Sequence, residues 1–150
     1  MIAVVGPGAD VDAATLAAAE RVGELLAAAG HDVVTGGLGG VMAAASHGAA
    51  AAGGRVIALL PGEAADEATE SADVVIPTGL GQARNVLVVR AASAVVAVGG
   101  SWGTLSEVAL ARRHDRPVVW LHGWTIDGPC DPVPTAATPE EAVAVTLACL

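Results

Sequence analysis

The sequence predicts an α/β fold in which a doubly wound, mostly parallel sheet of about six or seven strands is flanked by helices. Short valine-rich apolar runs alternate along the chain with longer alanine-rich runs whose apolar residues recur at helical spacing. Three of the short runs lead into clusters of glycine, which suit tight turns from a strand into a helix. We therefore expect residues 1–150 to form one domain built from repeated βα units.

The expected strands are short runs of β-branched and other apolar residues, and they cover residues 2–5, 32–34, 55–60, 74–76, 94–98 and 117–121. The expected helices cover residues 12–29, 41–52, 82–92, 104–113 and 139–148. The first helix carries apolar residues at helical spacing, and Gly30 is expected to end it. Residues 61–71 form a polar segment with several acidic side chains, which predicts a solvated surface loop or a short helix over the sheet edge.

The composition is typical of a compact domain with a large apolar core. Hydrophobic residues make up 53% of the chain and charged residues 15%, and a chain of this length buries roughly 68–70% of its unfolded surface. The formal net charge is −9 and lysine is absent. The acidic balance argues against a nucleic-acid partner. Without lysine the chain can form neither a Schiff base nor a Walker-type phosphate loop.

No metal site, disulfide or membrane segment is predicted. Cys130 and Cys149 lack metal-ligand spacing and are expected to be unpaired thiols. The four histidines are also spaced unlike metal ligands and are expected to be structural or solvent-facing: His31, His47, His114 and His122. The N-terminus lacks the pattern of a signal peptide, and no charge-free apolar run is long enough to span a bilayer. We expect a cytoplasmic protein.

The glycine clusters predict an anion-binding cleft. Residues 6–8, 36–40 and 99–103 follow the first, second and fifth expected strands, and ligands of such sheets lie beyond the carboxyl ends of the strands. At the third cluster the chain enters a helix, where free N–H groups and the helix dipole attract a phosphate. The first cluster lacks the third glycine of the dinucleotide fingerprint, and no acid follows the second strand, which disfavours NAD.

Glu107 lies one helical turn after Thr104, at the mouth of the third glycine cluster. A carboxylate there suits activation of water or stabilisation of positive charge on a sugar ring. Residues 104–107 also fit a capping box, in which Glu107 would only bond back to the N–H of Thr104. The spacing alone leaves both interpretations open.

Arg84 and Asn85 open the helix that precedes the fifth strand. An arginine there suits a clamp on a phosphate or a charge-assisted pair with Glu107. The alternative is a surface arginine paired with an acid of residues 63–73. Trp102 is placed to meet a ligand or a partner subunit, or simply to seal its loop, whereas Trp120 is expected in the core.

Three segments, residues 35–42, 83–85 and 99–107, together resemble the LOG-like (SLOG) Rossmann superfamily, once taken for lysine decarboxylases. The resemblance spans nearly the whole chain, and it implies a Rossmann-like fold. The superfamily includes phosphoribohydrolases, which cleave the N-glycosidic bond of nucleoside 5′-monophosphates, and molybdenum-cofactor carrier proteins, which bind without known turnover. By position, Arg84 is similar to the arginine and Glu107 to the glutamate of the catalytic pair of the hydrolases.

The sequence differs from the hydrolases at two places, and at both it resembles the short, carrier-type branch of the superfamily. The hydrolases have one residue between the paired glycines and Gly-Thr, where this chain has Ser101 and Trp102, and they carry lysine where this chain has Asn85. The carrier branch often places an acid after the equivalent of Met42, whereas this chain has Ala43. The resemblance also implies a homo-oligomer, either a dimer or a tetramer.

Binding of a phosphorylated small molecule, either a nucleotide or a molybdenum cofactor, is therefore predicted, and no resident cofactor is required. The residues expected to hold its phosphate are Gly36, Gly37, Gly39, Gly40, Gly99, Gly100, Ser101, Gly103 and Thr104. Further possible contacts are Gly6, Met42, Asn85 and Trp102. The alternative is a nucleoside 5′-monophosphate phosphoribohydrolase in which Arg84 orients Glu107. A sensing or assembly domain with a vestigial site is the third hypothesis.

Overall fold

The computed structural model describes residues 1–126 and 131–150 and shows a seven-stranded sheet whose neighbouring strands all pair in parallel. The strands are β1 (Ile2–Val5), β2 (Val33–Thr35), β3 (Val56–Leu60), β4 (Val74–Pro77), β5 (Ala94–Val98), β6 (Val118–Leu121) and β7 (Thr135–Ala136). Their order in the sheet is β4-β3-β2-β1-β5-β6-β7, so the winding direction reverses between β1 and β5. The predicted Rossmann-like, doubly wound fold is confirmed.

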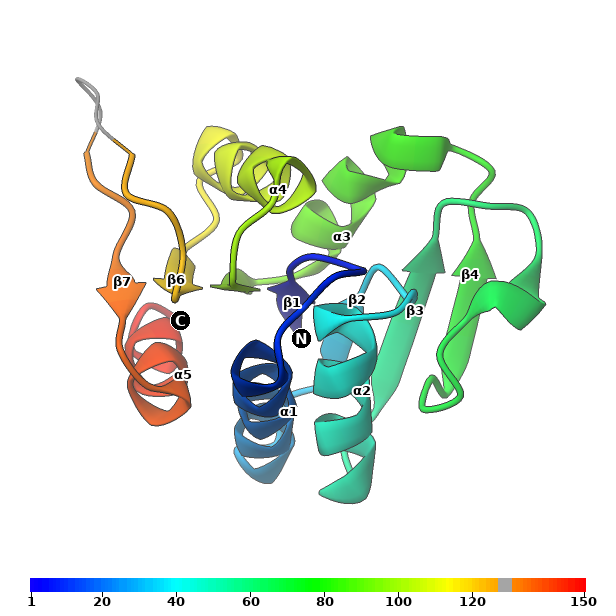
Figure 1. Cartoon of the computed structure of the whole chain (residues 1–150), viewed down its shortest axis with the longest axis horizontal. Coiled ribbons are helices and arrows are strands. Elements are labelled where there is room, and N and C mark those ends of the chain that lie inside the picture. Colours follow the sequence, from blue (N-terminus) through cyan, green and yellow to red (C-terminus); the bar gives the residue numbers. More distant parts are fainter. Residues whose placement is uncertain (127–130) are drawn as a thin grey trace.

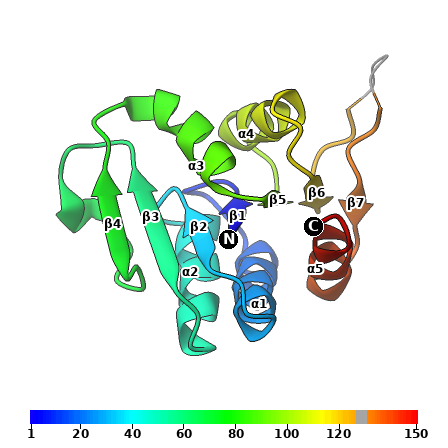
Figure 2. The same cartoon turned by 180° about the vertical axis from the view of Figure 1, so that it is seen from behind.

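Helices cover both faces of this sheet (Figures 1 and 2). One face carries α1 (Ala13–Ala28), α2 (Val41–Ala51) and α5 (Pro139–Ala148), and the other carries α3 (Asn85–Ala91) and α4 (Trp102–Arg113). Two short 3-10 helices, η1 (Ala65–Glu67) and η2 (Gly81–Arg84), lie in the connections. The helices α1 and α2 lie on the face opposite to α3 and α4 because right-handed crossovers between parallel strands run in one direction along the sheet up to β4 and in the opposite direction from β4 to β6.

Two predicted helices differ from the structure by more than a residue at one end, and one strand was not predicted. The helix expected over residues 82–92 is divided into η2 and α3, and the helix expected over residues 104–113 begins at Trp102. The earlier start follows from capping, because the side chain of Ser101 accepts a hydrogen bond from the N–H of Thr104 at 3.1 Å. The strand β7 is not predicted by the sequence, because its two residues are too few to show a periodic pattern.

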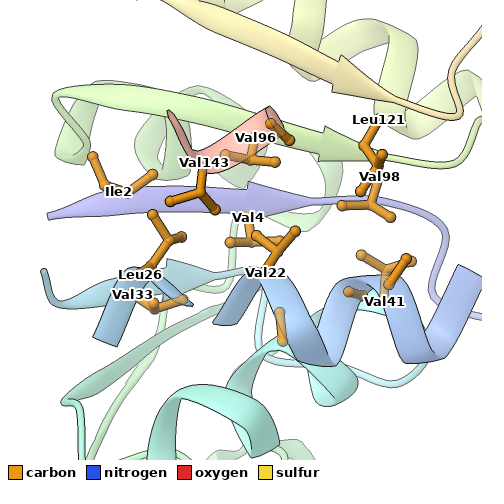
Figure 3. Close-up of a cluster of buried hydrophobic side chains, with 14 of the residues drawn as sticks. Ile2, Val4, Val22, Leu26, Val33, Val41, Val96, Val98, Leu121 and Val143 are labelled. Carbon is orange, nitrogen blue, oxygen red and sulfur yellow. The ribbon is translucent and has the colours of Figure 1, made fainter. Parts of the chain in front are cut away.

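The hydrophobic core consists of two layers, one on each face of the sheet. The layer under α1, α2 and α5 is built from valine, alanine and leucine with Ile2 (Figure 3). The layer under α3 and α4 contains Trp120, which is fully buried as predicted. In the part of the chain that the structure describes, no helix combines the length and the apolar character needed to cross a membrane. Cys149 is exposed and free, whereas Cys130 lies outside the described residues.

The helices α1 and α2 cross at two glycines. A Cβ at Gly23 would collide with the carbonyl group of Ala45, and a Cβ at Gly48 would collide with the carbonyl group of Glu20. In both cases the obstacle is backbone, so a side chain fits only if the two helices move apart. The close packing of the two helices therefore depends on these two glycines.

We expect Gly48→Ala to lower the free energy of unfolding by about 1–3 kcal/mol, because the added methyl group overpacks the crossing. Urea denaturation followed by circular dichroism measures the change. Gly103→Ala is the matched control, since a Cβ there would meet only the hydroxyl of Ser101 at 3.6 Å. If Gly48→Ala were as stable as the control, the two helices would separate without cost and the packing argument would be wrong.

Candidate functional site

The three glycine clusters meet at the carboxyl edge of the sheet, because β2, β1 and β5 are neighbours. A Cβ at Gly39 would lie 3.0 Å from the carbonyl oxygen of Gly8, and a Cβ at Gly99 would lie 3.6 Å from Cδ of Pro7. Gly40, at φ +61°, packs against the carbonyl oxygen of Pro7. The clusters thus form one continuous backbone surface at the point where the winding reverses, which is where sheets of this class bind ligands.

Part of this surface is engaged in internal contacts. The N–H of Gly37 donates to Oγ1 of Thr35 at 3.1 Å, and the N–H of Gly99 donates to the carbonyl oxygen of Leu121 at 2.9 Å. Gly6 packs against Val41 so closely that a Cβ would lie 2.5 Å from its Cγ1. Gly6 and the N–H groups of Gly37 and Gly99 are thus engaged in packing and internal hydrogen bonds.

The start of α4 is the open part of the surface. In the described residues, no backbone hydrogen bond engages the N–H groups of residues 100–103. Gly99 turns the chain into this loop at φ +67°, a backbone conformation that L side chains rarely adopt. Thr104 contributes no free N–H, because its N–H donates to Ser101. Four consecutive donors at a helix N-terminus form an arrangement suited to an anion.

Of the two interpretations of residues 104–107, the capping box is wrong. Ser101 caps α4, and its hydroxyl also lies 2.9 Å from that of Thr104. Glu107 therefore lies within the helix, one turn beyond Thr104, and is 7% exposed. Among the described residues, no hydrogen bond or ion pair engages its carboxyl group. The carboxyl group of Glu107 is thus available to a ligand or to solvent.

Arg84 is buried at the end of η2, so the alternative of a surface arginine is wrong. Its side chain is 5% exposed, and its Nη1 donates to the carbonyl oxygen of Leu59 at 2.7 Å. Its Nε is buried without a hydrogen-bond partner among the described residues. The guanidinium lies against Gly36, where a Cβ would collide with it and would also lie 2.5 Å from the sulfur of Met42. Gly36 and Met42 thus enclose the cation.

The charges of Arg84 and Glu107 interact without forming an ion pair within 4 Å among the described residues. Burial raises the pKa of Glu107 from 4.5 to about 7, although the positive charge of Arg84 lowers it. Burial also lowers the pKa of Arg84 below 12.5, against the effect of Glu107. Near neutral pH the carboxylate of Glu107 is therefore only partly formed, and the positive charge of Arg84 is incompletely neutralised.

Asn85 and Ser106 connect α3 to the start of α4. The side-chain amide of Asn85 donates to Oγ of Ser106 at 3.2 Å, and Oγ of Ser106 donates to the carbonyl oxygen of Gly103 at 2.7 Å. Asn85, Trp102, Gly103 and Ser106 are among the residues that line a groove between the two helices. Ser106 was not predicted as a site residue, since a single serine inside a helix gives no signal of such a role.

The remaining predicted site residues are placed as follows. Trp102, 79% exposed, is the first residue of α4. Met42 is 8% exposed, and its methyl group would lie 3.2 Å from a Cβ at Gly8. Trp124, one of only three aromatic residues in the chain, packs on Gly100. In the described residues, no group of His, Cys, Asp or Glu is arranged to hold a metal ion.

The fold and the glycine-lined edge define a Rossmann-like α/β protein with a polar site at the switch between β1 and β5. The SLOG cluster4 family matches residues 1–145, and the chain belongs to this family. An uncharacterized protein of Archaeoglobus fulgidus is 42% identical over 142 residues, which cover 95% of this chain and 91% of that protein.

Two solved structures are closely similar. The molybdenum cofactor binding protein of Rippkaea orientalis superposes with a TM-score of 0.90 at 35% identity, covering 99% of this chain and 95% of that one. The molybdenum cofactor carrier protein of Chlamydomonas reinhardtii superposes with a TM-score of 0.87 at 36% identity, covering 98% of this chain and 96% of that one. The resemblance to the SLOG superfamily is thus confirmed, and so is the similarity to its carrier proteins.

Proposed function

We propose that the protein binds and carries a phosphorylated small molecule of the molybdenum-cofactor type, with the phosphate at the carboxyl edge of the sheet. The observation that carries the proposal is the buried, incompletely neutralised cation of Arg84. A buried charge costs free energy unless a partner compensates it. In a chain with a net charge of −9, such a local positive charge is most simply explained by an anionic ligand.

The free N–H groups of residues 100–103 support the same proposal, because they supply donors to phosphate oxygens without a side chain in the way. Arg84 would add a charge-assisted contact, and its guanidinium occupies the space that a side chain at position 36 would fill. The ligand is cargo, so no turnover is required. The two carrier-type structural relatives, which match nearly the full length of the chain, support this choice of ligand class.

The hydrolase alternative is less well supported by the site. It needs an ionised Glu107 to stabilise a positive ribosyl centre. Burial raises the pKa of Glu107 to about 7, so only part of the protein carries the charged form near neutral pH. Incubation with a panel of nucleoside 5′-monophosphates, followed by chromatography for free base, tests this alternative. Release of base by the wild type and not by Glu107→Ala would replace the carrier proposal with an enzymatic one.

Arg84→Ala is expected to weaken binding of the molybdenum cofactor and of nucleoside 5′-monophosphates by about 10- to 150-fold, the loss of a charge-assisted hydrogen bond of about 1.5–3 kcal/mol. Equilibrium titration measures the dissociation constants. Arg90→Ala, which removes an exposed arginine of α3, is the matched control and should bind as the wild type does. Equal affinities of Arg84→Ala and Arg90→Ala would remove Arg84 from the site.

We also propose that the protein is a homo-oligomer, either a dimer or a tetramer. Exposed large apolar side chains support self-association, among them Leu80 and Leu87. Sedimentation equilibrium over a range of protein concentrations tests the number of subunits.

A further inference from the structure

The three tryptophans are the only aromatic residues of the chain, and they gather beside the loop that follows β5. Trp120 is fully buried, and its indole N–H donates to the carbonyl oxygen of Gly99 at 2.6 Å. The ring centroid of Trp124 lies 6.5 Å from that of Trp120 and 5.3 Å from that of Trp102. The rings therefore form a row that leads from the core to the surface.

Trp102 ends this row in solvent, with 79% of its surface exposed. Its ring and that of Trp124 meet edge to face at an interplanar angle of 79°, a favoured geometry for aromatic pairs. The contact positions the ring of Trp102 while leaving most of its surface uncovered. A ring that is held in place before a ligand arrives lowers the ordering cost of binding.

Trp124 is fitted closely to the glycine loop. Its indole lies so near Gly100 that a Cβ at that position would be 2.7 Å from Cδ1 of Trp124. The lack of a side chain at position 100 therefore leaves space for the indole of Trp124 as well as for an approaching anion. Trp102 contributes its N–H to the free donors of residues 100–103, so the aromatic pair and these donors belong to one loop.

Trp102 lies in a groove between α3 and α4. Gly103 and Asn85 line the same groove, and Arg84, the residue before Asn85 in the chain, is buried outside its lining. The positive charge of Arg84 complements an anionic group, and the exposed indole complements a flat apolar ring. A ligand that carries both groups would match both features of this part of the molecule.

We propose that Trp102, positioned by Trp124, stacks on the planar heterocyclic ring of the phosphorylated ligand. The inference rests on the proposed function, since it takes the phosphate to lie at the start of α4 and beside Arg84. Stacking between an aromatic side chain and a heterocycle tolerates many rings but requires a planar one. Trp102 is therefore a specificity-determining residue that selects ring-bearing phosphates over phosphates without a ring.

The test measures dissociation constants for three probes: the molybdenum cofactor, guanosine 5′-monophosphate and ribose 5-phosphate, which lacks a heterocyclic ring. The wild type is expected to bind at least one ring-bearing probe more tightly than ribose 5-phosphate. Trp102→Leu should weaken the binding of that ring-bearing probe about 10-fold and leave the affinity for ribose 5-phosphate unchanged. The variant keeps an apolar side chain at an exposed position, so the fold is preserved. Ile76→Ala, a change at another exposed apolar side chain, is the matched control.

Fluorescence supplies a second measurement, because tryptophan is the only strong emitter in this chain. A ring stacked on Trp102 should quench part of the emission of the wild type, and this part should be missing in Trp102→Leu. Ribose 5-phosphate should quench neither protein. Quenching that is equal in the two proteins would contradict stacking on Trp102.

The outcomes separate the inference from the proposal on which it rests. If ribose 5-phosphate and a ring-bearing probe bind and Trp102→Leu changes neither affinity, the phosphate site stands and the stacking inference is wrong. If no probe binds, the proposed function fails and the inference fails with it. Trp102→Leu could instead change the sedimentation coefficient while the affinity for the ring-bearing probe stays that of the wild type. In that case the indole of Trp102 makes contacts between copies of the protein, and the inference is overturned.

Discussion

Trp120→Ala is expected to lower the free energy of unfolding by about 3–5 kcal/mol, the largest effect of any single change considered for this protein. Trp120 is fully buried between the sheet and the helices α3 and α4, so its removal leaves a large cavity. The indole N–H also donates to the carbonyl oxygen of Gly99 at 2.6 Å, and this buried oxygen would lose its donor. Urea denaturation followed by circular dichroism measures the loss.

Trp120→Phe separates the two contributions, because it keeps a large ring and removes only the N–H with part of the volume. Leaving the carbonyl oxygen of Gly99 unpaired costs about 1–3 kcal/mol. Trp124→Ala is the control on the surface, where the side chain is 39% exposed and less is lost. If the Trp120→Ala protein were only as destabilised as Trp124→Ala, the indole would contribute little to the core.

Glu107→Gln is expected to stabilise the folded protein above pH 7. Burial raises the pKa of Glu107 from 4.5 to about 7, so folding favours the protonated carboxyl group. Between these pH values the folded state binds more protons than the unfolded state, and stability falls as the pH rises. Above pH 7 the buried carboxylate costs on the order of 3 kcal/mol, and glutamine avoids that cost.

The free energy of unfolding is measured at a series of pH values from about 4 to about 8. This range includes the pKa of an ordinary glutamate, 4.5, and the raised pKa of Glu107, about 7. The wild type should lose stability as the pH rises from 4.5 to about 7, and Glu107→Gln should lack this dependence. Glu140→Gln is the opposite control, because the hydrogen bond from Arg21 lowers the pKa of Glu140 and its contribution is lost as the pH falls. A pH profile unchanged by Glu107→Gln would mean that the carboxyl group is well solvated in the folded protein.

The order of strands and helices could be predicted because each strand is a short apolar run that is followed by a turn or a helix. β1 and β5 match the expected bounds at both ends, since a glycine follows each of them and Ser93 precedes β5. The meeting of the glycine clusters was also predictable, because the carboxyl ends of parallel strands lie at one edge. These features depend on local sequence and on rules that hold for all such sheets.

The state of the two ionisable groups could not be predicted, because it depends on how separate elements pack. Arg84 is buried only because η2 places it against the carbonyl oxygen of Leu59 and beside Gly36. The capping hypothesis for Glu107 failed because Ser101, which also suits a helix N-cap, lies three residues before Thr104. Trp124 follows β6 in a loop, so no periodic pattern relates it to Trp102.

The small side chains of the core have a consequence for conformational entropy. The layer under α1, α2 and α5 is built mainly from valine and alanine, with few long and flexible side chains (Figure 3). Alanine loses no rotamer freedom on burial, and valine is already restricted at χ1 before the chain folds. Ordering these side chains therefore costs little free energy, although each one also removes little apolar surface from water. The sheet that holds the glycine loops thus gains its stability from many small contributions, with backbone layers packed close together.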